Sequence, residues 1–173
     1  MRGPRGILRS LLGALTRSGR IVAPVERPDP GSRADALQTR EVTPPAAADL
    51  TISYAPDRDG DPDGGEIVWT WVPYVEQDGR GKDRPVLVLG PASGGRVYAV
   101  KLTSKPREGD ADAVALGAGP WDARGRPSWV DLDQVYVVHP AGMRREAAAL
   151  DRERFARVAE ILRRRYGWRS DVS

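Results

Sequence analysis

The sequence contains no cysteine and a single histidine, His139, among its 173 residues. The absence of cysteine excludes disulfide bonds, a thiolate nucleophile and a cysteine zinc site, and one histidine cannot form a histidine cluster. Aromatic residues are few, at 6%, and no apolar run approaches the about 18 residues that span a bilayer. We therefore expect one soluble globular domain, with a tail, in a reducing compartment.

Charge of one sign is not in large excess. The chain has 27 Lys and Arg residues against 24 Asp and Glu residues, a formal net charge of +3. This mild cationic bias is compatible with a polyanionic partner such as nucleic acid, but it does not require one.

A row of alternating aspartates, Asp57 to Asp63, invites comparison with a calcium-binding loop. Counted from Asp59, however, the twelfth position is Thr70, where a calcium loop needs a bidentate Glu. The pattern therefore favours a surface turn, and we expect no bound metal.

The N-terminal segment 1–20 combines several arginines and no acid with apolar residues at helical spacing. Its apolar stretch from Leu11 to Leu15 is shorter than the roughly 7 to 15 residues of a secretory signal, so no signal peptide is predicted. We expect a cationic amphipathic segment that is loosely helical or ordered by a partner. Weak contact with an anionic membrane surface is the alternative.

Residues 21–63 are rich in proline and poor in periodic apolar residues. Such a segment cannot bury enough surface to offset its ordering entropy, so we expect a largely disordered linker. The exception is Leu50–Tyr54 (LTISY), whose β-branched and aromatic residues alternate with polar ones and could add an edge strand to the following domain.

A folded domain is predicted over residues 64–169. An apolar stripe that begins at Phe155, after a capping residue at Asp151, predicts a C-terminal amphipathic helix. We expect a mainly β fold, a small, strongly bent, mostly antiparallel barrel or half-barrel with this helix packed on it. Strands are predicted at residues 66–74, 85–89, 96–103, 114–116 and 128–139, the last with a bulge.

Two of these strands form a predicted hairpin around the turn GPASGG, with Gly90 and Arg96 as its flanking pair. This register places Arg84 at the same rim as Thr103 and Ser104. Because side chains alternate between faces, Ser104 shares the side of Arg84 in this register, and Thr103 shares it after a shift of one residue. The guanidinium fork and either hydroxyl could hold a phosphate.

Further cations lie near this rim. Arg80 and Lys82 precede Arg84 in a Gly-punctuated loop, and Lys105 follows the hydroxyl pair. Tyr74, at the mouth of the same loop, is a candidate for stacking on a base. A basic loop can equally be a solvated connection, so these residues predict nucleic-acid binding only together with other signals.

Four segments follow one another through the predicted domain: GEIVWTWVPY, DRPVLVLG, VKLTSK and WVDLDQVYVV. Together with the terminal helix, they resemble the PemK/MazF family of toxin endoribonucleases over about residues 64–166. The resemblance implies an SH3-like barrel, a homodimer, and metal-independent cleavage of single-stranded messenger RNA in the cytoplasm, without a cofactor. It also implies a cognate antitoxin protein as a partner.

Carried over residue by residue, the functional Arg of the family falls on Arg84 and its Thr or Ser on Thr103, with Ser104 beside it. The resemblance implies that these groups stabilise charge on the phosphate while the RNA 2′-hydroxyl attacks and leaves a cyclic phosphate. The proton acceptor stays open between Glu76, which echoes an E-Q pair of the family, and Asp133, which matches an Asp that acts as base in some members.

Two other hypotheses are compatible with these residues. The loop before Arg84 is longer than the family pattern, and Asp131 stands where a better-studied variant carries Arg. A catalytically silent relative that binds nucleic acid or a protein would show the same motifs. Alternatively, residues 1–20 tether the domain to a membrane or to another protein, without RNA chemistry.

Overall fold

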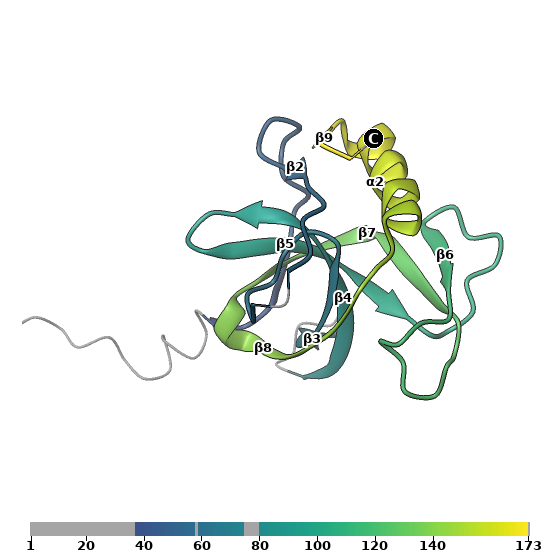
Figure 1. The fold of residues 1–173 in the computed structure, drawn as a ribbon. Helices are drawn as coiled ribbons and strands as arrows, with labels where there is room; N and C mark the ends of the chain where they lie inside the picture. Colours follow the sequence, from purple (N-terminus) through teal and green to yellow (C-terminus); the bar gives the residue numbers. More distant parts are fainter. Residues whose placement is uncertain (1–36, 58, 75–79, 173) are drawn as a thin grey trace, which may run out of the picture.

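The computed structural model describes residues 37–57, 59–74 and 80–172. In this part of the chain, strands dominate and one α-helix lies near the C-terminus (Figure 1). The predicted amphipathic segment 1–20 lies outside the described residues. The elements in chain order are β1 (Arg40–Val42), β2 (Thr51–Ile52), β3 (Glu66–Pro73), β4 (Gly81–Ala92), β5 (Arg96–Thr103), β6 (Ala113–Gly117), β7 (Ser128–Val138), the 3₁₀ helix η1 (Pro140–Gly142), β8 (Met143–Ala149), α2 (Arg152–Tyr166) and β9 (Arg169–Ser170).

The main sheet is antiparallel and curls on itself. Its order is β1-β7-β5-β4-β3-β8, with β6 also paired to β7, while β2 and β9 form a separate parallel pair. Thr70 of β3 donates its hydroxyl proton to the carbonyl of Gly142 at 3.1 Å, so its oxygen accepts from Thr39, just before β1, at 2.6 Å. This contact brings the β1 end of the sheet to β3, and the predicted bent β fold is confirmed.

Side-chain alternation gives the sheet two faces. The outer face packs under α2 and the β2–β9 pair, where its core residues include Leu50, Ile67, Leu87, Val100, Phe155 and Leu162. The face that carries Thr70 lies inside the curl, and we call it the inner face. One end of the inner face is apolar and is built mainly from Val68, Val86, Val88, Ala99 and Tyr136. The strands therefore have an apolar core on both sides, and this leaves polar side chains for the remaining end of the inner face.

The helix α2 begins and ends as its sequence predicts. The carboxylate of Asp151 accepts a hydrogen bond from the N–H of Arg154 at 2.9 Å, which caps the first turn. Gly167 ends the helix in the left-handed region, with a φ of 73°, where a side chain would be strained. Within the described residues, no helix is both long and apolar enough to cross a membrane.

The segment predicted as a linker is partly ordered. Its strand β1 pairs with β7, and the side chains of Leu50 and Ile52 are fully buried, with 0% exposure. A largely disordered linker is therefore wrong for residues 37–57 and 59–63, because the sheet edge and the core order a chain that has no apolar period of its own. The strand predicted at Leu50–Tyr54 is present as β2, but it pairs with β9 and not with the main sheet.

Candidate active site

Arg84 and Thr103 lie on the same face of neighbouring strands. Val86 of β4 pairs with Lys101 of β5, and continuing this register by two residues places Arg84 opposite Thr103. Directly opposed residues point to the same side of a sheet, so both side chains belong to the inner face. Of the two hydroxyls that the sequence offered, the register therefore selects Thr103, and Ser104 follows it at the end of β5.

The observed register is shifted by one residue from the predicted one, for a reason that lies in the turn. The hairpin closes with Ala92 paired to Arg96, and not with Gly90. Gly94 adopts a φ of 69° in this short turn. A register irregularity next to Gly90 then absorbs a residue in β4. Neither feature is visible in the alternation of the sequence, which explains the difference.

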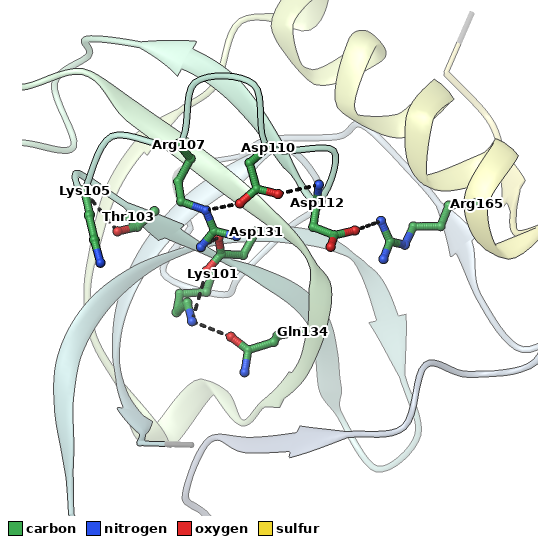
Figure 2. A network of polar contacts seen from close by, with 9 residues as sticks. All are labelled: Lys101, Thr103, Lys105, Arg107, Asp110, Asp112, Asp131, Gln134 and Arg165. Atoms are coloured by element: carbon green, nitrogen blue, oxygen red, sulfur yellow. Dashed lines mark hydrogen bonds and ion pairs between the residues drawn. The ribbon is translucent and has the colours of Figure 1, made fainter. Parts of the chain in front are cut away.

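The chain that follows β5 orients the Thr103 hydroxyl. Its Oγ1 accepts a hydrogen bond from the backbone N–H of Lys105 at 3.1 Å. This bond occupies a lone pair and leaves the hydroxyl proton for a ligand. The side chain of Lys105 is exposed beside Thr103, at the same rim of the sheet (Figure 2).

The side chain of Arg84 is half-buried and has no ion pair or hydrogen bond with another residue in the described ranges. Its neighbour Asp83 points to the other face and forms a 3.5 Å ion pair with Arg144. Lys82, on the same side as Arg84, is exposed. A guanidinium without a carboxylate partner, next to a hydroxyl donor, suits an anionic ligand such as a phosphate.

Tyr74 and Arg80 flank the loop between β3 and β4. The N–H of Tyr74 donates to the carbonyl of Arg80 at 2.9 Å, so the two ends of the loop meet. Tyr74 is half-buried and Arg80 is exposed. The ring of Tyr74 and the cation of Arg80 thus lie at the start of β4. Arg80 is four residues before Arg84 in the sequence.

A buried ion-pair network borders the Thr103 rim (Figure 2). The side chain of Asp131, on β7, is 4% exposed, and its two oxygens lie 3.0 Å from Lys101 Nζ and 3.1 Å from Arg107 Nη1. Lys101 also donates to Gln134 Oε1 at 2.5 Å. Because Lys101 and Thr103 lie on one strand two residues apart, the network shares the inner face with Thr103.

The loop between β5 and β6 is tied to this network. Arg107 donates to Asp110 at 2.6 Å, and this hydrogen bond is the main reason why the pKa of Arg107 is raised. The N–H of Asp112, and then Arg107, lower the pKa of Asp110. Asp112 forms a further ion pair of 2.6 Å with Arg165 of α2. The loop that follows Thr103 is therefore held by charges from β7 and from the helix.

Tyr136 lies at the boundary between the apolar and the polar ends of the inner face. Burial raises the pKa of its phenol well above the usual range, the negative charge of Glu41 raises it further, and Arg84 acts in the opposite direction. The phenol therefore stays protonated at neutral pH. The charges of Glu41, on β1, and Arg84, on β4, thus act on the same hydroxyl in opposite directions.

Of the two proton acceptors that the sequence predicts, the structure describes only one. Glu76 falls in residues 75–79, outside the described part of the chain. Asp133 is exposed on β7, beside the network, and its side chain has no hydrogen bond or ion pair to any described residue. Among the residues that the structure describes, no three His, Asp or Glu side chains are placed to hold a metal ion.

Comparison with known proteins gives one match that covers most of the chain. A sequence model described as "PemK-like, MazF-like toxin of type II toxin-antitoxin system" matches residues 63–165. The chain belongs to this PemK/MazF toxin family. The resemblance noted in the sequence is thereby confirmed, over nearly the same residues. A search of curated proteins gave no match.

Several solved structures are similar to this chain. A MazE–MazF complex from Deinococcus radiodurans (Form-II) has 26% identity and a TM-score of 0.49, and the similarity covers 62% of this chain and 96% of that one. An endoribonuclease from a mycobacterial species has 17% identity and a TM-score of 0.45, covering 62% and 93%. The Mycobacterium tuberculosis toxin MazF-mt6 has 20% identity and a TM-score of 0.44, covering 60% and 97%.

Several polar residues at this rim of the PemK/MazF domain were not identified from the sequence. Lys101 could have been found, because its position two residues before Thr103 on a predicted strand puts both on one face. Arg107 and Gln134 carry no local signal, since their partners come from other elements. Glu41 was missed because it lies in the segment predicted as a linker.

Proposed function

We propose that this chain is a metal-independent endoribonuclease toxin that cleaves single-stranded messenger RNA in the cytoplasm. Family membership supports the general activity, because PemK/MazF toxins are known as endoribonucleases. The observation that carries the proposal is the juxtaposition of Arg84, which has no ion pair with a described residue, and the Thr103 hydroxyl on one face of adjacent strands.

In the proposed reaction, the scissile phosphate rests between these two side chains. The Arg84 guanidinium binds the non-bridging oxygens, and the Thr103 hydroxyl donates to one of them. Negative charge accumulates on these oxygens as the 2′-hydroxyl attacks phosphorus, so donors aimed at them stabilise the transition state more than the ground state. The products are a 2′,3′-cyclic phosphate and a 5′-hydroxyl.

Most of the remaining predicted residues have binding roles in this proposal. Arg80, Lys82 and Lys105 supply positive charge along the RNA backbone, and counterion release makes such contacts strongly salt-dependent. Tyr74 offers a ring on which a base can stack. Ser104 stands beside Thr103 as a second hydroxyl, and Glu76 and Asp133 are the proton acceptors that the sequence suggests.

We further propose two protein partners. The family description places its members in type II toxin–antitoxin systems, so a cognate antitoxin protein is expected to bind and neutralise this chain. A homodimer is expected as well, as in the resemblance noted above. Size-exclusion chromatography with light scattering tests the dimer directly.

The decisive experiment is digestion of a long RNA by the purified protein in excess EDTA, with mapping of the new ends. We expect cleavage at a recurring sequence, with cyclic phosphate ends, and no cleavage by an Arg84→Ala variant that keeps its melting temperature. Intact RNA that is bound with a steep salt dependence would instead identify a silent RNA-binding relative.

A further inference from the structure

Strand β1 lies outside the matched family region and yet completes the polar end of the inner face. The match begins at residue 63, whereas β1 spans Arg40–Val42 and pairs with β7. The segment that the sequence predicted to be a linker therefore contributes side chains to the site. Among these side chains, only Glu41 of β1 is acidic.

The strand register places Glu41 on the inner face. Glu41 pairs with Tyr136, and Tyr136 in turn pairs with Ala99 of β5. Because opposed residues share a side and alternate residues along a strand do too, Glu41 points to the same side as Lys101 and Thr103. A direct contact agrees with the register, since Gln134 Nε2 lies 3.3 Å from both carboxylate oxygens of Glu41.

The closure of the curled sheet brings Glu41 towards Arg84. Thr39, two residues before Glu41 and on the same face, is hydrogen-bonded to Thr70, and Thr70 is the strand partner of Arg84. The two charges also act on one group, the Tyr136 hydroxyl, in opposite directions. A carboxylate therefore stands across the polar end of the inner face from the guanidinium.

Glu41 differs from Asp131 and Asp112 in having no cation partner among the described residues. Asp133 also lacks such a partner, but it is exposed, whereas Glu41 is half-buried and held by Gln134. Asp131 is held by Lys101 and Arg107, which engage its two carboxylate oxygens. Asp112 is likewise paired, with Arg165. The Glu41 carboxylate is held in place by a neutral amide, so it is oriented without being neutralised.

We propose that Glu41 is the proton acceptor of the RNA cleavage. This inference rests on the proposed function. The 2′-hydroxyl oxygen forms a bond to phosphorus, its proton passes to the Glu41 carboxylate, and the bond from phosphorus to the 5′-oxygen breaks, with that oxygen taking a proton from water. Glu41 then returns its proton to solvent. Of the groups around Glu41, Gln134 contacts it, Tyr136 is its strand partner, and Lys101 binds the same Gln134 side chain. The charges of Arg84, Asp131 and Asp133 act on the Tyr136 hydroxyl together with that of Glu41.

The experiment is a single-turnover cleavage assay across pH with saturating enzyme. Glu41→Gln is nearly isosteric and is expected to lower the rate by about 10²- to 10⁴-fold, the usual contribution of a general base. It should also remove the rise in rate with pH that ionisation of a carboxyl group produces. Affinity for an uncleavable RNA with a 2′-deoxy nucleotide at the cut should stay within about threefold, because the same phosphate contacts remain.

A matched control comes from the same strand. Arg40→Gln also removes one charge from β1, but on the side opposite to Glu41, and it should leave the cleavage rate and its pH profile unchanged. Glu76→Gln and Asp133→Asn test the other two acids. The rise in rate with pH that ionisation of a carboxyl group produces is the acidic limb of the pH profile. If Glu76→Gln or Asp133→Asn removes this acidic limb while Glu41→Gln keeps it, the inference is overturned.

The outcomes separate the inference from the proposed function. If the wild type cleaves, Arg84→Ala does not, and Glu41→Gln cleaves at the wild-type rate with the same pH profile, only the role of Glu41 is wrong. If the wild type cleaves no RNA, both are wrong. Should Glu41→Gln fail to fold, Glu41→Asp decides: a rate at least about tenfold lower with the acidic limb kept supports the inference, and loss of that limb overturns it.

Discussion

Lys101 Nζ lies 3.0 Å from Asp131 Oδ2, and this ion pair joins β5 to β7 next to the proposed phosphate site. Both side chains are largely buried, with 14% and 4% exposure. The same carboxylate forms an ion pair with Arg107, which lies in the loop after Thr103 and so ties that loop to β7. Asp131 therefore holds together the strand that carries Thr103 and the loop whose N–H orients its hydroxyl.

Removing the Asp131 carboxylate is expected to destabilise the fold. Asp131→Ala leaves the largely buried ammonium of Lys101 without a carboxylate, while Arg107 keeps Asp110, and breaking a buried pair costs about 3 to 5 kcal/mol. Urea unfolding should show this loss in the free energy of unfolding. The double variant Lys101→Met/Asp131→Leu should recover most of it, because an apolar pair of similar volume is close to neutral. Additive losses in the double variant would contradict a coupled pair.

Substitution of Arg84 tests the phosphate site. Arg84→Lys keeps the charge but loses the bidentate fork, so it should cleave far more slowly than the wild type. Arg84→Ala also loses the charge, and it should show no detectable cleavage, a loss in kcat of more than about 10²-fold. Lys82→Ala, two residues earlier on the same side of β4, is the matched control. It should weaken RNA binding and reduce the salt slope by about 1, with kcat unchanged. Equal effects of Arg84→Ala and Lys82→Ala on kcat would contradict the assignment of Arg84 to the reaction and of Lys82 to binding alone.

The hydroxyl of Thr103 can be deleted without changing the side-chain shape. Thr103→Val should lower kcat by about 10-fold or more, because one donor to the charged oxygens is lost. Stability should fall by only about 1 kcal/mol, the usual net value of the lost hydrogen bond from Lys105. Ser104→Ala is the control for the neighbouring hydroxyl and should have the smaller kinetic effect. The opposite ranking in the EDTA assay would assign the donor to Ser104.

Glu160, on the surface of α2, should make the stability of the protein depend on pH in the acidic range. Hydrogen bonds from Arg163 and Arg164 lower the pKa of Glu160 to about 2. The unfolded chain has the ordinary pKa of about 4.3, so the stabilisation is present above that pH and is lost as the pH falls towards the folded value. The difference in melting temperature between the wild type and Glu160→Gln, followed by circular dichroism, should therefore shrink between about pH 4 and pH 2. A difference that grows on acidification would contradict this sign.

Much of the barrel could be predicted from local patterns. The alternation of apolar residues in β3 and β5 and the Asp151 cap of α2 are properties of short segments, and short-range sterics and burial decide them. The predicted register of the hairpin that carries Arg84 and Thr103 differs from the observed one by one residue. Because side chains alternate along a strand, each of these side chains could lie only on one face or the other. β8 was missed, because its sequence MRREAAA has no alternation and its pairing with β3 is decided by the sheet.

The sequence by itself determined the family, the strands that carry Arg84 and Thr103, and the capped helix, because each depends on residues that are close together along the chain. Only the tertiary structure decided that β1 closes the curl, that Leu50 and Ile52 enter the core, and that Glu41 joins the inner face. Such contacts link segments far apart in the chain, and their free energy comes from burial and pairing that no single segment possesses before the sheet has formed.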